Sequence, residues 1–150
     1  MKALIKLTLK GIGIGLLLVV LTLSTYVQID HRLVKPVGKF YYTLYKNDIP
    51  IPYTKSFTAQ FLPALPYNNI AYAYTDTSVG HMVISEKHWA DLTDNEKNVV
   101  VYHEMIHNVL GESHDWINTK SIMYPSKKLM KIKDADEMLQ EYIDNYKKKK

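Results

Sequence analysis

The sequence of 150 residues contains no cysteine. The chain therefore has no disulfide, no thiolate nucleophile, no cysteine-ligated zinc site and no iron–sulfur cluster. A bacterial-type lipid anchor is excluded for the same reason, because it is attached to a cysteine. Among the residue types that bind metals, histidine is the notable one, since three of the six histidines lie within twelve residues.

Basic residues are scarce between the two ends of the chain. Lys and Arg number 19 against 15 Asp and Glu, but seven of the lysines lie at the ends of the chain. These are Lys2, Lys6, Lys10, Lys147, Lys148, Lys149 and Lys150. The remaining twelve basic residues face 15 acidic ones, a net charge near −3. Because no internal stripe of basic and aromatic residues remains, nucleic acid is not expected as a partner.

The N-terminal segment is typical of a targeting signal. After the three lysines, Gly11–Val27 is a run of 17 residues without charge. As a helix it would be about 25 Å long, slightly short of a hydrocarbon core. Thr22 and Ser24 would make a poor cleavage site, so residues 1–30 are either a signal anchor or a signal peptide. In both cases we expect an exported domain, either membrane-anchored or, after cleavage, secreted or periplasmic.

The rest of the chain, 31–150, suffices for one folded domain of class α+β, with residues 147–150 as a basic tail. A helix is predicted near Pro36, with an apolar face that ends before Asn47 and consists of Phe40, Tyr41, Leu44 and Tyr45. Apolar and alternating runs predict short strands over 57–61, 70–74 and 81–85.

Two further helices have clear start signals. Thr93-Asp-Asn-Glu96 is a capping box that opens a helix ending at Gly111. Asp134 and Glu137 form a second capping pair ahead of a helix with apolar residues three or four apart. That apolar face consists of Ala135, Met138, Leu139, Tyr142, Ile143 and Tyr146.

The first of these helices contains the sequence His103-Glu104-Met-Ile-His107. Residues four apart in a helix lie one above the other, so the two imidazoles can reach one tetrahedral ion. Glu104 is rotated by about 100° and lies beside the ion, where its carboxylate can hold a water. The pattern predicts a metal-dependent hydrolase.

A third histidine follows this helix. Gly111 permits a sharp turn, and His114 comes three residues later, which brings another imidazole back toward the ion. Three neutral ligands with an open fourth position are typical of a catalytic zinc site. The segment Ser121-Ile-Met123-Tyr-Pro125 comes next.

Residues 102–125 resemble the metzincin zinc peptidases, nearest the matrixin-like branch. The resemblance implies a small zincin domain with a short mixed sheet, an active-site helix and a C-terminal helix. It implies zinc as the cofactor, with His103, His107 and His114 as its ligands. It further implies Glu104 as the general base, Met123 as an apolar floor beneath the metal and Pro125 as the start of the substrate-pocket wall.

The spacing departs from the usual family pattern by one residue. Gly111 and His114 follow His107 by four and seven residues instead of three and six. The longer form is similar to that of small bacterial metzincin-like proteins. Those proteins also resemble this chain in a tryptophan shortly before the active-site helix, here Trp89.

The resemblance implies a zinc-dependent endopeptidase that hydrolyses peptide bonds with a metal-activated water. Glu104 would take the proton of the water and deliver it to the leaving amine. A peptide or protein substrate would add as an antiparallel strand to an exposed sheet edge. We expect residues 81–85 to form that edge.

Two alternatives stay open. In a gluzincin-like site the third ligand would be a carboxylate of the last helix, Glu137 or Glu141. In a catalytically inactive, membrane-anchored module, the same fold would bind a partner. Glu104 argues against the second alternative, because a purely structural metal has no use for a base.

Overall fold

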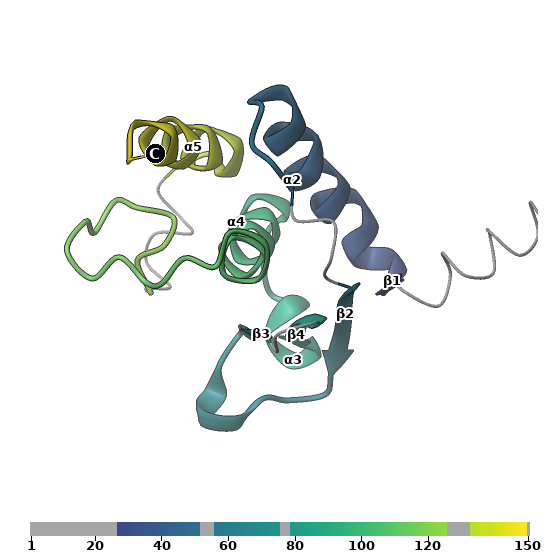
Figure 1. Ribbon diagram of the computed structural model, residues 1–150. Coiled ribbons are helices and arrows are strands. Elements are labelled where there is room, and N and C mark those ends of the chain that lie inside the picture. The colour runs from purple at the N-terminus through teal and green to yellow at the C-terminus, as the bar shows by residue number, and fades with distance from the viewer. Residues whose placement is uncertain (1–26, 52–55, 76–78, 126–132, 150) are drawn as a thin grey trace, which may run out of the picture.

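The structure is a computed structural model that describes residues 27–51, 56–75, 79–125 and 133–149. Its longer helices lie on one side of a single sheet (Figure 1). The strands are β1 (Val27–Ile29), β2 (Ser56–Leu62), β3 (Ala71–Thr75) and β4 (Val79–Ser85). The longer helices are α2 (Val34–Lys46), α4 (Asp94–Met105) and α5 (Ala135–Lys149). Shorter elements are η1 (His31–Leu33), η2 (Pro66–Asn68), α3 (Glu86–Trp89) and η3 (Ile106–Leu110), a π-helical turn that continues α4.

The sheet has four strands in the order β1-β2-β4-β3. β1, β2 and β4 run parallel to one another, and β3 pairs with β4 in the antiparallel direction. The three strands predicted from the sequence are confirmed. Residues 27–29, grouped in the sequence analysis with the targeting segment, are instead paired with Phe57, Thr58 and Ala59 of β2.

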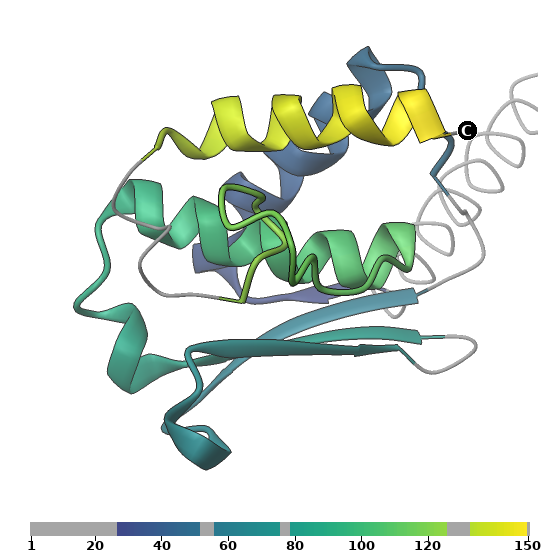
Figure 2. The same cartoon turned by 90° about the vertical axis from the view of Figure 1, so that its left-hand side faces the viewer.

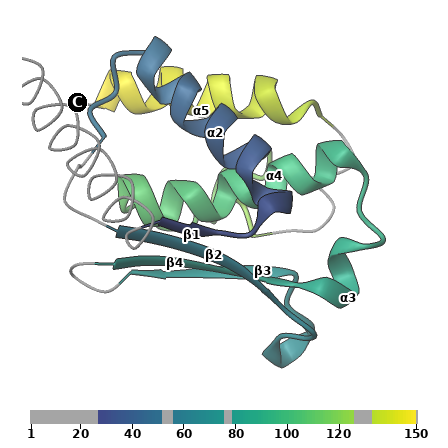
Figure 3. The same ribbon diagram turned by 90° about the vertical axis from the view of Figure 1, so that its right-hand side faces the viewer.

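The core lies between the sheet and the helices. Phe57 and Ala59 of β2 and Met82 and Ile84 of β4 are buried members of this core, because every second side chain of a strand points to the same face. α4 lies directly over the sheet, and α5 packs on the far side of α4 (Figures 2 and 3). The site helix is therefore covered on both sides.

The predicted helices are confirmed, with two local differences. Phe40 and Leu44 of α2 are buried, but Tyr45 is 75% exposed and does not belong to the apolar face. On α5 the predicted face is buried or half-buried, and the Asp134 carboxylate accepts hydrogen bonds from two backbone N–H groups at the helix start. The helix continues through Lys149, so the described lysines of the basic tail are its last turn.

The mixed composition of sheet and helices agrees with class α+β. The predicted edge, residues 81–85, is wrong: β4 is hydrogen-bonded on both sides, and the antiparallel strand β3 is the edge nearest the site helix. Residues 1–26 of the predicted targeting segment lie outside the described residues. Within the described part, no helix combines the length and apolar character needed to cross a bilayer.

Candidate metal centre

The site is built on α4, which starts at a complete capping box. The Thr93 hydroxyl accepts a hydrogen bond from the Glu96 N–H, and the Glu96 carboxylate accepts one from the Thr93 N–H at 2.7 Å. At the far end, the Tyr102 hydroxyl donates to Asp136 of α5 at 3.0 Å. These contacts fix the helix before the first histidine of the motif.

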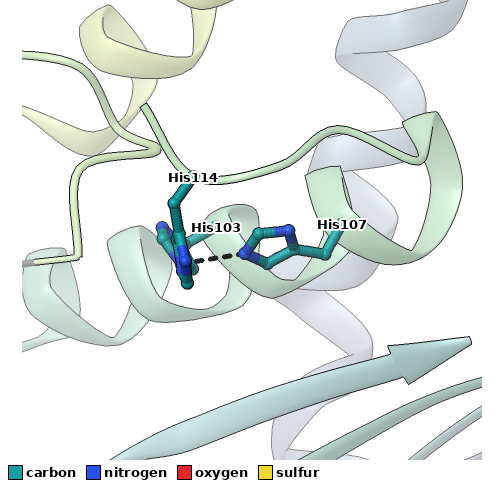
Figure 4. Close-up of side chains that lie close together, drawn as sticks. All are labelled: His103, His107 and His114. Carbon is teal, nitrogen blue, oxygen red and sulfur yellow. Dashed lines mark hydrogen bonds between the residues drawn. The ribbon is translucent and has the colours of Figure 1, made fainter. Parts of the chain in front are cut away.

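Three imidazoles meet at the end of this helix. The Nε2 atom of His103 lies 3.1 Å from that of His114 and 3.2 Å from that of His107 (Figure 4). Tetrahedral zinc with bonds of 2.0–2.1 Å requires ligand nitrogens about 3.3 Å apart. The cluster is therefore close enough, in number, type and spacing of donors, to hold one metal ion.

Backbone carbonyls orient two of the rings. The His103 Nδ1 lies 2.7 Å from the carbonyl oxygen of Ile122, and the His107 Nδ1 lies 2.6 Å from that of Glu112. A carbonyl accepts but does not donate, so the proton of each neutral ring is held on Nδ1. The Nε2 lone pairs then face the centre of the cluster. In metal sites, a contact to the other ring nitrogen commonly fixes the tautomer and orientation of a histidine in this way.

The surroundings favour uncharged ligands. Burial, together with the neighbouring His107 and His114, lowers the pKa of His103 to about 4, despite the opposing bond to Ile122. Burial also lowers the pKa of His114, with a further contribution from His107. Neutral imidazole is the form that binds metals, so these two shifts favour the metal-binding form of His103 and His114.

The extra residue of the spacer is absorbed by η3. A π turn closes i→i+5 bonds and takes in one residue more than an α turn. The turn spans Ile106–Leu110, and Gly111 follows in the left-handed conformation, with φ of 71°. His114 therefore reaches the other two rings although it lies seven residues after His107.

Glu104 faces the same cavity as the three histidines. Its side chain is only 7% exposed, and it accepts a hydrogen bond from the Ala73 N–H of the edge strand β3. Burial raises the pKa of Glu104 to about 8, and the bond from Ala73 opposes this shift. A divalent cation on the imidazoles would lower this pKa again, because opposite charge favours the carboxylate.

A cavity of about 300 Å³ lies between α4 and the edge strand. Its apolar lining includes Val99 and Val100 of α4 and Ile70 just before β3. Tyr124 and Pro125 complete it on the far side, so the structure brings Pro125 to the same cavity as the histidines.

Met123 is 1% exposed and belongs to the hydrophobic core. Its carbonyl accepts a hydrogen bond from the Asp115 N–H at 3.0 Å, which closes the loop after the third histidine. The Asp115 carboxylate also accepts from Ile117 and Asn118 within this loop. Met123 thus anchors the segment whose Ile122 carbonyl orients His103.

The carboxylates of α5 do not join the cluster. Among the described residues, the group that could hold a metal ion consists of the three histidines alone. Glu141 pairs with Lys133, and Glu137 is exposed. The geometry therefore favours His114 over the gluzincin-like alternative.

Four contributors escaped the sequence analysis: the Ala73 N–H, the carbonyls of Glu112 and Ile122, and Asn108, a buried residue after His107 that donates a hydrogen bond to the His81 carbonyl. The first three are backbone groups, which carry no signal in residue type. Asn108 did carry one, because an amide within an otherwise apolar helix end needs an explanation.

Comparisons of this chain with protein-family models, curated proteins and solved structures find no match. The assignment of a function therefore depends on the site.

Proposed function

We propose that this protein is an exported zinc endopeptidase of the metzincin type, nearest the matrixins. The observation that carries the proposal is the convergence of three Nε2 atoms, 3.1 and 3.2 Å apart, in the cavity that also holds Glu104. A purely structural zinc site is normally closed by four protein ligands. Here three imidazoles leave one position for water or substrate.

Zinc suits this donor set, and when bound it would polarise a peptide carbonyl and lower the pKa of water toward neutrality. Glu104 accepts the proton of the attacking water, and it then donates that proton to the leaving amine. The N–H of Ala73 holds the carboxylate in place for both transfers. A carboxyl group whose pKa is raised by burial and would be lowered by a bound cation can both accept and donate a proton near neutral pH.

The edge strand supplies a place for the peptide. The 300 Å³ cavity touches residues 69–73, and a second hollow of about 460 Å³ touches Ala73 and Tyr74, so the two hollows follow one another along β3. His107 and His114 line both hollows. A peptide added to β3 would run from one hollow to the other past the three histidines.

Export is the part of the proposal that depends on the sequence alone. The three N-terminal lysines and the uncharged run Gly11–Val27 support an exported protein, either membrane-anchored or released after cleavage.

The proposal is tested by zinc analysis of the full chain, purified in detergent, together with His114→Ala. We expect one zinc per chain in the parent and a loss of affinity of at least 100-fold in the variant, since one of three ligands is gone. His31→Ala is the matched control, because His31 is exposed and lies outside the cluster. Equal zinc content in parent and His114→Ala would contradict the proposed ligand set.

The inactive binding module makes a different prediction. If the parent and Glu104→Ala leave a panel of denatured proteins equally intact while both bind zinc, the module is correct and the peptidase is not.

A further inference from the structure

We propose that Asn108 is a positioning residue, which pins the widened end of the site helix to the sheet and thereby sets where His107 and His114 lie. This inference rests on the proposed zinc site. It adds an explanation of how the segment between His107 and His114, one residue longer than usual, still brings both histidines to the cluster. It concerns the first residue after the second histidine, within the π turn.

Asn108 connects the helix to a central strand. Its side chain is 3% exposed, and its amide nitrogen donates a hydrogen bond of 3.1 Å to the carbonyl oxygen of His81 on β4. This is a tie between the π turn and the sheet that depends on one side chain. The apolar residues of the turn do not fix its position in the same way, because hydrophobic contacts are non-directional whereas a hydrogen bond is directional.

The amide is held tightly from the strand side. A Cβ atom at Gly80 would lie 3.0 Å from the Asn108 Oδ1 and 3.4 Å from its Cγ, closer than side chains normally approach. The same Oδ1 is buried and has no hydrogen-bond partner among the described residues. An apolar residue of equal size would fill this space without an unpaired oxygen, so packing alone does not account for the asparagine.

The tie reaches the ligands through the backbone. Asn108 directly follows His107, whose carbonyl accepts the capping N–H of Gly111 at 3.2 Å and whose Nδ1 contacts the Glu112 carbonyl at 2.6 Å. Gly111 and Glu112 begin the loop that carries His114. A shift of the turn relative to β4 would therefore move two ligands of the cluster while leaving His103 on the regular part of α4.

The test measures zinc affinity and the visible spectrum of the cobalt form in the full chain. Asn108→Leu keeps the volume but removes the hydrogen bond, and Asn108→Ala removes both. We expect the zinc Kd to rise about 10- to 100-fold in each variant, as for other outer-shell groups. We also expect weaker visible absorption of the cobalt form. Displaced ligands allow the coordination number to rise above four, and Co(II) absorbs less strongly in that geometry than in a tetrahedral one. Leu139→Ala on α5 is the control for lost core packing, and it should lower the melting temperature without changing Kd or spectrum.

Gly80→Ala approaches the same contact from the strand. In the parent it should raise the zinc Kd, because its methyl group displaces the Asn108 amide. In the Asn108→Ala background it should have little further effect, because the contact with the amide is gone and the Phe57 ring, 3.4 Å away, is at an ordinary van der Waals distance.

An unchanged Kd and cobalt spectrum in both Asn108 variants would overturn the inference. So would equal effects of Gly80→Ala in both backgrounds. If instead the parent chain fails to bind zinc or cobalt through its three histidines, both the proposed function and this inference are overturned, whereas failure of the inference alone leaves metal binding by the parent intact.

Discussion

Two buried glutamates lie on the same site helix, one at its start and one near its end. Glu96 is 8% exposed and Glu104 7% exposed. Glu96 accepts hydrogen bonds of 2.7 Å from both the N–H and the hydroxyl of Thr93. Glu104 receives a backbone hydrogen bond from Ala73, and burial raises its pKa to about 8. The first carboxylate completes a helix cap, whereas the second is held in a cavity beside three imidazoles.

The difference separates two tasks of one helix: its start stabilises the fold, and its end carries the residues of the proposed chemistry. Its first turn is stabilised by Thr93 and Glu96, which satisfy each other's hydrogen bonds. This stabilisation does not depend on a metal ion. The last turns of the helix hold His103, Glu104, His107 and Asn108 in half-buried or buried positions. Buried polar groups without a full set of partners reduce stability, and they persist where function requires them.

The largest expected effect concerns hydrolysis. Glu104→Gln keeps the shape and the acceptor for Ala73 but cannot take a proton, so cleavage of a denatured substrate should fall about 10²- to 10⁴-fold. Zinc content should stay at the parental level, because Glu104 is not a member of the histidine cluster. Thr93→Ala is the control at the other end of the helix, and it should keep most of the parental rate at a temperature where it is folded. Cleavage by Glu104→Gln at the parental rate would remove the distinction between the two glutamates.

The next effect is a pH-dependent difference in unfolding free energy between metal-free Glu104→Gln and the metal-free parent. With a pKa of about 8 in the folded state and 4.5 as the model value, Glu104 binds its proton more tightly when folded. This contribution is fully present below pH 4.5 and is lost as the pH rises toward 8. Metal-free Glu104→Gln should therefore match the parent near pH 4.5 and exceed its unfolding free energy by on the order of 3 kcal/mol near pH 8. Urea unfolding at both pH values measures this, and a constant difference would contradict the assigned pKa.

The smallest effect is at the cap. Thr93→Ala removes the acceptor for the Glu96 N–H and should lower the unfolding free energy by about 1 kcal/mol. Zinc affinity, measured below the melting temperature, should remain within twofold of the parent, because the cap lies at the opposite end of the helix. A large loss of affinity would show that the two ends are coupled.

Local patterns in the sequence predicted most of the elements. The alternation around Phe57 and the capping box at Thr93 are signals within a few residues, and both structures form as expected. β1 was missed because residues 27–29 continue the long uncharged run and carry no boundary of their own. The edge was assigned to the wrong strand because alternation identifies a strand but not its neighbours, which depend on pairing between distant segments.

The site was also predictable only where local spacing determines it. The i, i+4 spacing of His103 and His107 fixes their relative position on a helix. The place of His114 depends instead on the turn that separates it from His107. Counting residues gave a spacer one too long for the usual pattern, and only the coordinates show the π turn that absorbs it. The carbonyls that orient the rings come from Glu112 and Ile122, whose side chains have no part in the contact.

The most direct measurement is the anomalous X-ray signal of zinc in crystals of the metal-loaded protein. We predict a single peak within 2.0–2.1 Å of the Nε2 atoms of His103, His107 and His114, with a non-protein oxygen as the fourth ligand. A peak bound to only two of these histidines, or one completed by a carboxylate of α5, would contradict it.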